Sequence, residues 1–181
     1  MEDICRNYNK RPGPSGEATC DKCLGKGYVR EVKDGEIVMV PCGCLARRES
    51  IRRMRESGLG ALLERCTLDS YTAATHWQKA IKAGAEQYIQ SPNGHWFFIG
   101  GQVGGGKTHI CTAIVSELMR QGMGARYFMW RDVVAIRASV NDPEEYRRQI
   151  EPLKTVQVLY IDDFFKAGGD PTAGDVNIAF E

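Results

Sequence analysis

A glycine-rich segment that ends in Lys-Thr has the residue types needed to hold a triphosphate. Residues 101–108 fit the pattern Gly-x-x-x-x-Gly-Lys-Thr, the Walker A motif. Glycines let consecutive backbone N–H groups turn toward a phosphate, at φ angles that a side chain opposes. Lys107 can then reach the β- and γ-phosphates, and the Thr108 hydroxyl can bind Mg²⁺. The predicted nucleotide contacts are Gly101, Gln102, Val103, Gly104, Gly105, Gly106, Lys107, Thr108 and His109.

Two adjacent carboxylates supply the other half of the predicted site. Asp162 and Asp163 end an apolar run that begins at Val158, and Asp162 lies 55 residues after Lys107. Such a run is typical of a buried parallel strand whose carboxyl end points toward a ligand, although a strand can also end by chance in an acidic turn. Asp162 would join Thr108 in holding Mg²⁺, and Asp163 would polarise the attacking water. Lys107, Asp162 and Asp163 are the predicted catalytic residues, and the second acid favours hydrolysis over simple nucleotide kinase chemistry.

Four cysteines flank a predicted β-hairpin. Cys20 and Cys23 precede it with two intervening residues, and Cys42 and Cys44 follow it with one. The hairpin is predicted from alternating residues on both sides of the turn at 33–35. The four thiolates would meet at its open end and form a tetrahedral structural Zn²⁺ site, the alternative being free or redox-active cysteines. Because so small a hairpin is marginal by itself, the metal would do much of the folding.

A helical pattern covers residues 45–66, with a break at 57–60. Its first part is crowded with arginines, which predict a face for single-stranded nucleic acid or an acidic partner. The alternative is an ordinary solvated helix face, whose charge Glu49 and Glu56 reduce. The arginines are Arg47, Arg48, Arg52, Arg53 and Arg55.

Composition limits the possible classes of function. The 24 basic and 23 acidic residues give a formal net charge of +1, so any contact with nucleic acid must be local. We find no apolar run long enough for a membrane span and no signal peptide, so we expect a cytoplasmic protein without a membrane partner. Seven cysteines in that compartment favour metal binding or free thiols over disulfides.

The elements that must position the site alternate between strands and helices. A helix beginning at 73 or 76 and ending at 89 has the spacing to pack on a sheet. Residues 1–19 show no periodicity, which predicts a flexible arm. Strands are predicted over 96–99, 125–130 and 156–161, and helices over 110–119, 131–140 and 144–150, with a further helix from 175.

Together these residues resemble the DnaC/IstB group of AAA+ ATPases, most closely DnaC-like replicative helicase loaders of bacteria and their phages. The resemblance is carried by residues 101–109, 159–166, 171–172 and 175–181. It implies an α/β fold with a P-loop NTPase core of the additional-strand type, preceded by a small zinc-ribbon-like hairpin module. It also implies ATP and Mg²⁺ as cofactors.

The resemblance implies an ATP-dependent loader that holds a DnaB-like replicative helicase open around single-stranded DNA and releases it on hydrolysis. The N-terminal module would contact the helicase, and the ATPase domain would bind DNA and form a homo-oligomer in the full-length protein. An IstB-like transposition ATPase is one alternative. The other is a zinc-ribbon adaptor in which the nucleotide is a latch that is not hydrolysed.

The chain departs from this group after the Walker B strand, because no sensor strand, arginine finger or further strand can be placed. In the group's sheet the sensor strand lies between the Walker A and Walker B strands, and unpaired strand edges lose many hydrogen bonds. We therefore expect a truncated chain that is weak or inactive as an ATPase by itself. The expected domains are the arm at 1–19, the zinc-ribbon-like module with the arginine-rich helix at 20–65, and an incomplete AAA+ domain at 66–181.

Overall fold

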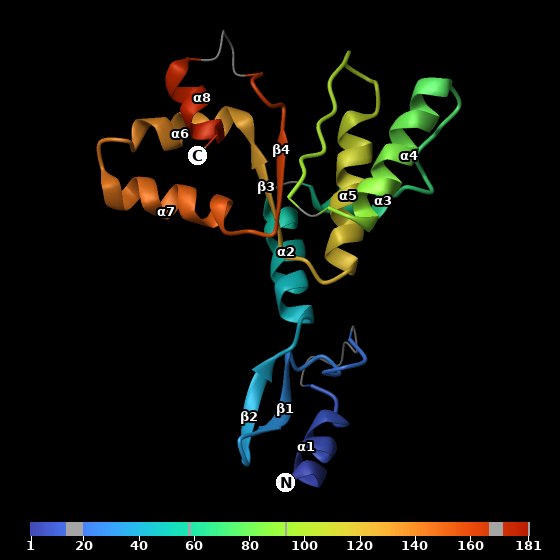
Figure 1. Ribbon diagram of the computed structural model, residues 1–181, viewed down its shortest axis with the longest axis vertical. Helices are drawn as coiled ribbons and strands as arrows, with labels where there is room; N and C mark the ends of the chain where they lie inside the picture. The colour runs from blue at the N-terminus through green and yellow to red at the C-terminus, as the bar shows by residue number, and fades with distance from the viewer. Residues whose placement is uncertain (14–19, 58, 93, 167–171, 181) are drawn as a thin grey trace. The chain divides into compact units, whose positions relative to one another are not determined.

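The structure, a computed structural model, describes residues 1–13, 20–57, 59–92, 94–166 and 172–180 (Figure 1). It divides into two compact units, Met1–Glu49 and Ser50–Glu181, which are described separately. The smaller unit contains the four clustered cysteines, and the larger one contains the glycine-rich loop and the paired aspartates. The two candidate sites therefore belong to different units.

The smaller unit is built on the predicted hairpin. Strands β1 (Tyr28–Lys33) and β2 (Glu36–Pro41) pair antiparallel, with Tyr28 opposite Pro41 and Lys33 opposite Glu36. Asp34 and Gly35 both have positive φ, at 51° and 80°. Two such residues form the two-residue turn that suits the twist of a hairpin. The hairpin prediction is confirmed.

Helix α1 (Glu2–Asn9) corrects the prediction of a flexible arm over residues 1–19. The negative charges of Glu2 and Asp3 in its first turn interact favourably with the positive end of the helix dipole. Cys5 is buried. The Asn9 amide donates to the Arg30 carbonyl at 2.9 Å and accepts from the Arg30 N–H at 2.8 Å. These contacts with β1 stabilise the helix. They involve Arg30, which is distant in the sequence, so the residues of the helix alone do not predict them. The rest of the predicted arm, residues 14–19, lies outside the described residues.

Helices α2 (Cys44–Glu56) and α3 (Gly60–Arg65) confirm the predicted helical stretch with its interruption. Gly58, within the interruption, lies outside the described residues. Met54 and Leu59 are buried against residues of α5 (Lys107–Arg120) and of the parallel strands β3 (Ala125–Met129) and β4 (Val158–Asp162). Ser50 accepts a hydrogen bond on Oγ from the Ala125 backbone N–H at 2.9 Å, which fixes the start of β3.

Two helices of the larger unit pack on each other. Helix α4 (His76–Gln90) begins at a capping box, in which the Thr75 hydroxyl accepts from the Gln78 N–H and the Gln78 side chain accepts from the Thr75 N–H. Helix α5 (Lys107–Arg120) follows the glycine-rich loop. Their shared core contains Tyr71, Ala85, Ile89, Ile110, Ile114 and Leu118.

Strands β3 (Ala125–Met129) and β4 (Val158–Asp162) form a parallel pair in which Met129 lies opposite Asp162. The connection between them runs through η1 (Trp130–Asp132), α6 (Val133–Ala138) and α7 (Pro143–Lys154), and α8 (Ala173–Phe180) follows later. In Figure 1, these helices lie on one side of the strand pair and α4 and α5 on the other. This arrangement confirms the α/β class and puts the carboxyl ends of both strands at one edge.

The predicted strand over residues 96–99 does not form in the described structure. Residues 95–100 belong to neither sheet, and β3 is the partner described for β4. Phe97 and Ile99 still pack into the α4–α5 core, whereas Phe98 is 75% exposed. This alternation is that of a strand, but strand structure also requires ladder hydrogen bonds to a neighbour. The prediction of a strand over 96–99 is therefore wrong, whereas the expectation that this segment lacks a partner strand agrees with the described residues.

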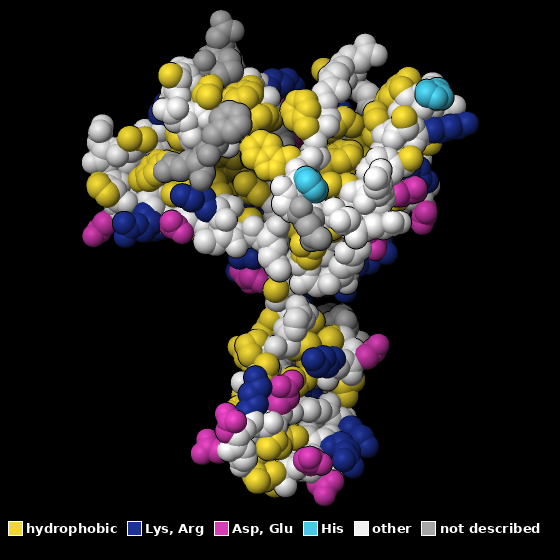
Figure 2. Space-filling model, in the orientation of Figure 1, with side chains coloured by type: hydrophobic (Ala, Val, Ile, Leu, Met, Phe, Trp, Pro, Cys, Tyr) yellow, Lys and Arg dark blue, Asp and Glu magenta, His cyan; other side chains and the backbone are white. Residues whose placement is uncertain are grey.

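Apolar side chains remain on the surface of the larger unit. Phe98, Val103 and Leu159 are exposed, and Figure 2 shows hydrophobic side chains over much of the viewed face of this unit. Isolated exposed apolar residues are common in folded proteins. Within the described ranges, no helix combines the length and the apolar character that crossing a membrane requires.

Candidate functional site

The glycine-rich loop turns sharply before α5. Gly101, Gly104 and Gly106 have φ of 134°, 81° and 79°, a region that favours glycine. Gly106 is the N-cap of α5, so the loop leads into the positive end of that helix. A loop of this kind before a helix N-terminus is suited to an anionic phosphate.

The Lys107 ammonium lies against this loop. Its Nζ donates to the carbonyl of Gly101 at 3.0 Å and to the carbonyl of Gln102 at 2.8 Å. These two residues open the loop and Lys107 follows its end, so the hydrogen bonds span the turn. The positive charge is thus held at the loop that the sequence predicts for phosphate.

The Tyr71 ring packs closely against Gly106 at the end of the loop. It is buried, and a Cβ built on Gly106 would lie 3.0 Å from its Cε2 atom. The Tyr71 ring also makes an edge contact with the His109 ring, with centroids 5.4 Å apart. His109 Nε2 lies 3.0 Å from the Thr67 carbonyl, which can only accept, so Nε2 carries the hydrogen. The described contacts of His109 are therefore with residues 67–71 rather than with the loop.

We expect Gly106→Ala to destabilise the larger unit by about 1–3 kcal/mol, because alanine at this φ is strained and its Cβ would crowd Tyr71. The matched control is Gly84→Ala in the interior of α4, where a Cβ meets no atom within 4 Å. That change should stabilise by about 0.5–1 kcal/mol through helix propensity. Urea unfolding of both variants measures the difference, and equal effects at the two positions would contradict the argument.

Asp162 is oriented by two donors at the tip of β4. Its Oδ2 accepts from the Tyr127 hydroxyl at 3.2 Å, and its Oδ1 accepts from the Asp163 backbone N–H at 3.0 Å. Burial, and then the negative charge of Asp162, raise the pKa of Tyr127 above its usual value. The phenol therefore stays protonated and continues to donate at neutral pH.

The first turns of α5 lie close to the acidic end of β4. Burial raises the pKa of the Cys111 thiol to about 12, and the charge of Asp162 adds to the shift. Burial also raises the pKa of Tyr160; the charge of Asp162 adds to it, and the side chain of Thr108 opposes it. Thr108 and Asp162, the two predicted Mg²⁺ ligands, thus both act on one tyrosine. A hydroxyl and a carboxylate are oxygen ligands of the kind that bind Mg²⁺.

Asp163 lies just beyond β4. Its φ is 52°, in the left-handed region, and its side chain is half-exposed. Its Oδ1 lies 3.3 Å from the Lys166 ammonium. The carboxylate is accessible to water, as a residue that polarises an attacking water must be.

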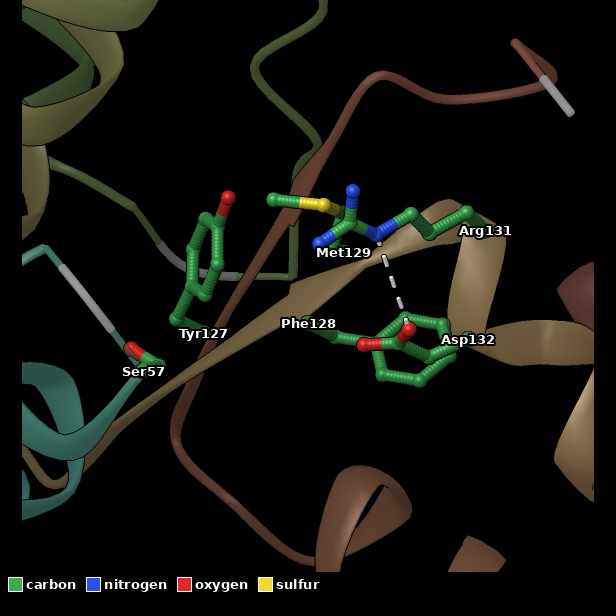
Figure 3. Close-up of a pocket in the computed structure, with 6 residues that line it drawn as sticks. All are labelled: Ser57, Tyr127, Phe128, Met129, Arg131 and Asp132. Carbon is green, nitrogen blue, oxygen red and sulfur yellow. Dashed lines mark ion pairs between the residues drawn. The ribbon is translucent and has the colours of Figure 1, made fainter.

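A cavity of about 160 Å³ lies at the carboxyl end of β3 and was not predicted from the sequence (Figure 3). Tyr127, whose hydroxyl bonds Asp162, is part of its wall. Arg131 and Asp132 form an ion pair there, with Nε and Oδ1 3.8 Å apart. Ligands of parallel α/β sheets bind beyond the carboxyl ends of strands, a rule that could have drawn attention to these two residues. The lining residues are Ser57, Tyr127, Phe128, Met129, Arg131 and Asp132.

The second candidate site is the cluster formed by Cys20, Cys23, Cys42 and Cys44. Their four Sγ atoms lie within 4.8 Å of one another. The Cys20–Cys42 pair is 3.7 Å apart and the Cys23–Cys44 pair 3.3 Å apart, and all four are free thiols. Four sulfurs bound to one Zn²⁺ at about 2.3 Å lie about 3.8 Å from each other. The donor set fits a structural zinc ion, as the sequence predicts.

The surroundings of the cluster favour the thiolate at Cys23 and oppose it at Cys42 and Cys44. Burial opposes ionisation of Cys23, but hydrogen bonds from the Gly27 N–H and from Cys44 lower its pKa to about 7. The Gly27 N–H lies 3.3 Å from the Cys23 sulfur. The pKa values of Cys42 and Cys44 are raised, chiefly by burial. Thiols this close resist ionising together, and a divalent cation would compensate their charge.

The arginines of α2 are partly engaged within the protein. Arg48 donates to the Gly25 carbonyl at 2.9 Å. Arg52 pairs with Glu56 at 3.1 Å, and Arg55 pairs with Glu64 at 3.5 Å. Two of the five predicted contact residues thus lie beside carboxylates, which reduces the local positive field. A contact of Arg47, Arg48, Arg52, Arg53 and Arg55 with DNA or a partner stays a prediction.

No protein-family model matches the chain. It is 42% identical over 89 residues to the chromosomal replication initiator protein DnaA of Gluconobacter oxydans, which covers 45% of this chain and 18% of DnaA. It is 25% identical over 116 residues to the replicative helicase loader DnaC of Escherichia coli K12, covering 62% of this chain and 47% of DnaC. It is 28% identical over 167 residues to the phage-like element PBSX protein XkdC of Bacillus subtilis, covering 86% of this chain and 62% of XkdC.

The chain thus spans less than two thirds of the length of each of these three relatives. The similarity is distant, and it supports a relationship to DnaC- and DnaA-like AAA+ replication proteins.

Proposed function

We propose that this chain contains the nucleotide-binding part of an AAA+ ATPase that loads a replicative helicase onto single-stranded DNA. ATP binding and hydrolysis would switch the contacts with helicase and DNA. One observation carries the ATPase part of the proposal. The glycine-rich loop, with the Lys107 ammonium on its carbonyls, leads into the N-terminus of α5, which lies at the same edge as the acidic end of β4 (Figure 1).

Each residue has a distinct role in the proposed reaction. The backbone N–H groups of the loop at 101–106 would bind the phosphates, and Lys107 would place its ammonium on the β- and γ-phosphates. Thr108 and Asp162 would hold Mg²⁺, with Tyr127 and the Asp163 N–H keeping the Asp162 carboxylate in place. Bound Mg²⁺ would neutralise the developing charge on the phosphates. Asp163 would orient and polarise the attacking water.

The partners are proposed from the similarity to a protein named as the replicative helicase loader DnaC. We assign a DnaB-like helicase to the zinc-ribbon-like module and the arginine-rich helix, residues 20–65, and single-stranded DNA and self-association to the ATPase domain, residues 66–181. The compact units divide earlier, after Glu49, because Ser50 and Met54 of α2 already contact the core of the larger unit. The functional and structural boundaries therefore differ by residues 50–65, which include the second part of α2 and all of α3.

Isothermal calorimetry of the full-length protein tests the nucleotide site. We expect Mg–ATP to bind the wild type and Lys107→Ala to bind it roughly 10- to 100-fold more weakly, because a hydrogen bond to a charged group contributes about 1.5–3 kcal/mol. Lys79→Ala, an exposed position on α4, is the matched control and should bind like the wild type. Absence of ATP binding by the wild type would contradict the proposal.

A second measurement separates the loader from its rivals. The full-length protein should retain a DnaB-like helicase in a pull-down with Mg–ATP, and release it during turnover on single-stranded DNA. Binding of ATP without turnover would favour the adaptor with a nucleotide latch. Turnover without helicase retention would favour an IstB-like transposition ATPase.

A further inference from the structure

The carboxylate proposed to polarise water is already paired with a cation. Asp163 Oδ1 lies 3.3 Å from the Nζ of Lys166, three residues later. The Lys166 backbone N–H also donates to the Asp163 carbonyl at 2.8 Å, which closes a turn between the two residues. Neither the phosphate loop nor Asp162 takes part in this pair in the described structure.

The backbone of this turn is strained and must be stabilised from outside. Asp163 and Phe165 have φ of 52° and 58°, although neither is glycine. Such conformations are uncommon for residues with side chains, and they persist where the surroundings determine them. Within the turn itself, the hydrogen bond between Lys166 and Asp163 alone does not account for two left-handed residues.

A buried tryptophan supplies the missing stabilisation. The ring centroids of Phe164 and Phe165 lie 4.7 and 5.0 Å from that of Trp130, both in edge-on arrangements. Trp130 is only 2% exposed and directly follows β3. Edge-on aromatic pairs stabilise beyond the area that they bury. The backbone after β4 is thus anchored to the end of β3, and the side chains of Asp163 and Lys166 are the parts free to rearrange.

The ion pair competes with the role proposed for Asp163. A carboxylate oxygen that accepts from an ammonium has less capacity to accept from a water molecule. The two side chains are 52% and 67% exposed, so solvent screens their attraction and the pair opens readily. While Lys166 holds Oδ1, its positive charge offsets the negative charge with which the carboxylate would polarise a water, whichever of the two oxygens that water contacts.

We propose that Lys166 is a positioning residue that restrains hydrolysis by holding Asp163 away from the attacking water until the pair opens. The proposal rests on the proposed ATPase function and adds a regulatory element to that same site. The pair is closed while Lys166 contacts Asp163, and hydrolysis requires the ammonium to move off the carboxylate. The Trp130 anchor keeps the backbone fixed, so opening needs a side-chain rotation alone.

Steady-state ATP hydrolysis by the full-length protein tests the restraint. Lys166→Gln should raise kcat about two- to fivefold and leave KM for ATP unchanged, in proportion to the weak pairing of exposed ions. Lys166→Arg should keep the wild-type rate, since guanidinium can pair with the same carboxylate. Lys154→Gln, at the exposed last turn of α7, is the control and should leave kcat unchanged.

The dependence of the hydrolysis rate on ionic strength distinguishes the proposed ion pair from a purely structural role of Lys166. Because salt screens exposed pairs, the ratio of the Lys166→Gln rate to the wild-type rate should fall toward one between 0.05 and roughly 0.5 M salt. An unchanged or lower kcat in Lys166→Gln, with hydrolysis by the wild type intact, would overturn the restraint alone. A wild type that neither binds nor hydrolyses ATP would overturn both this proposal and the proposed function.

Discussion

Replacing Asp163 with Asn is expected to leave ATP bound and to reduce its hydrolysis by about 100-fold or more, since general-base groups contribute roughly 10²–10⁴ in rate. The amide keeps the shape of the side chain and loses the charge that polarises water. Asp163 lies outside β4 and is half-exposed, so the loss should not spread to the fold. Single-turnover hydrolysis and calorimetry of the same preparations separate chemistry from binding.

The matched control for this variant is Glu86→Gln. Glu86 is an exposed carboxylate on α4, outside the residues assigned to the candidate site. We expect its turnover to stay near that of the wild type. Equal losses at the two carboxylates would point to a general electrostatic effect, and full activity of Asp163→Asn would exclude Asp163 as the group that polarises water.

Loss of zinc should unfold the smaller unit. The double variant Cys20→Ser and Cys23→Ser removes two of the four clustered sulfurs, and structural zinc contributes about 10–16 kcal/mol of apparent binding energy in small domains. The buried core around the cysteines contains little besides them and Val29. Elemental analysis should find one zinc per chain in the wild type and none in the variant. The amide NMR signals of residues 20–44 should collapse toward unfolded positions.

Cys5→Ser is the control, because Cys5 is buried in the same unit but lies outside the cluster. It should keep its zinc and its folded spectrum. Zinc should also be lost as pH falls, because the metal binds thiolates and protons compete for them. Hydrogen bonds lower the pKa of the metal-free Cys23 thiol to about 7, and bound Zn²⁺ would keep its thiolate deprotonated at lower pH still. A wild type that keeps its spectrum with a chelator present would show that the metal is not structural.

Local patterns predicted the elements whose causes are local. The turn at Asp34 and Gly35 lies between alternating residues, and α4 begins at the Thr75 capping box, so both could be read from neighbouring letters. The spacing of Gly101, Gly106 and Lys107 likewise predicted a tight loop before a helix. The glycines allow the turn of the backbone, and the lysine side chain can reach a phosphate held by the loop.

Features that depend on distant partners could not be predicted in the same way. Helix α1 is supported by the pairing of Asn9 with Arg30, 21 residues away. Residues 96–99 have the alternation of a strand, but pairing depends on a neighbour and not on the segment itself. The contacts of Phe164 and Phe165 with Trp130 likewise join the ends of two strands. Because Trp130 is distant in the sequence, the residues next to Lys166 did not predict the strained turn.

The amide of Asn9 also has a consequence for how the small unit behaves at high concentration. Arg30 lies in β1, and both of its main-chain polar groups are taken by Asn9. Open strand edges act as templates on which further chains can add and aggregate. At this position an incoming strand would first have to displace a side chain that already makes both hydrogen bonds, so α1 acts as a cover against edge-to-edge polymerisation of the hairpin.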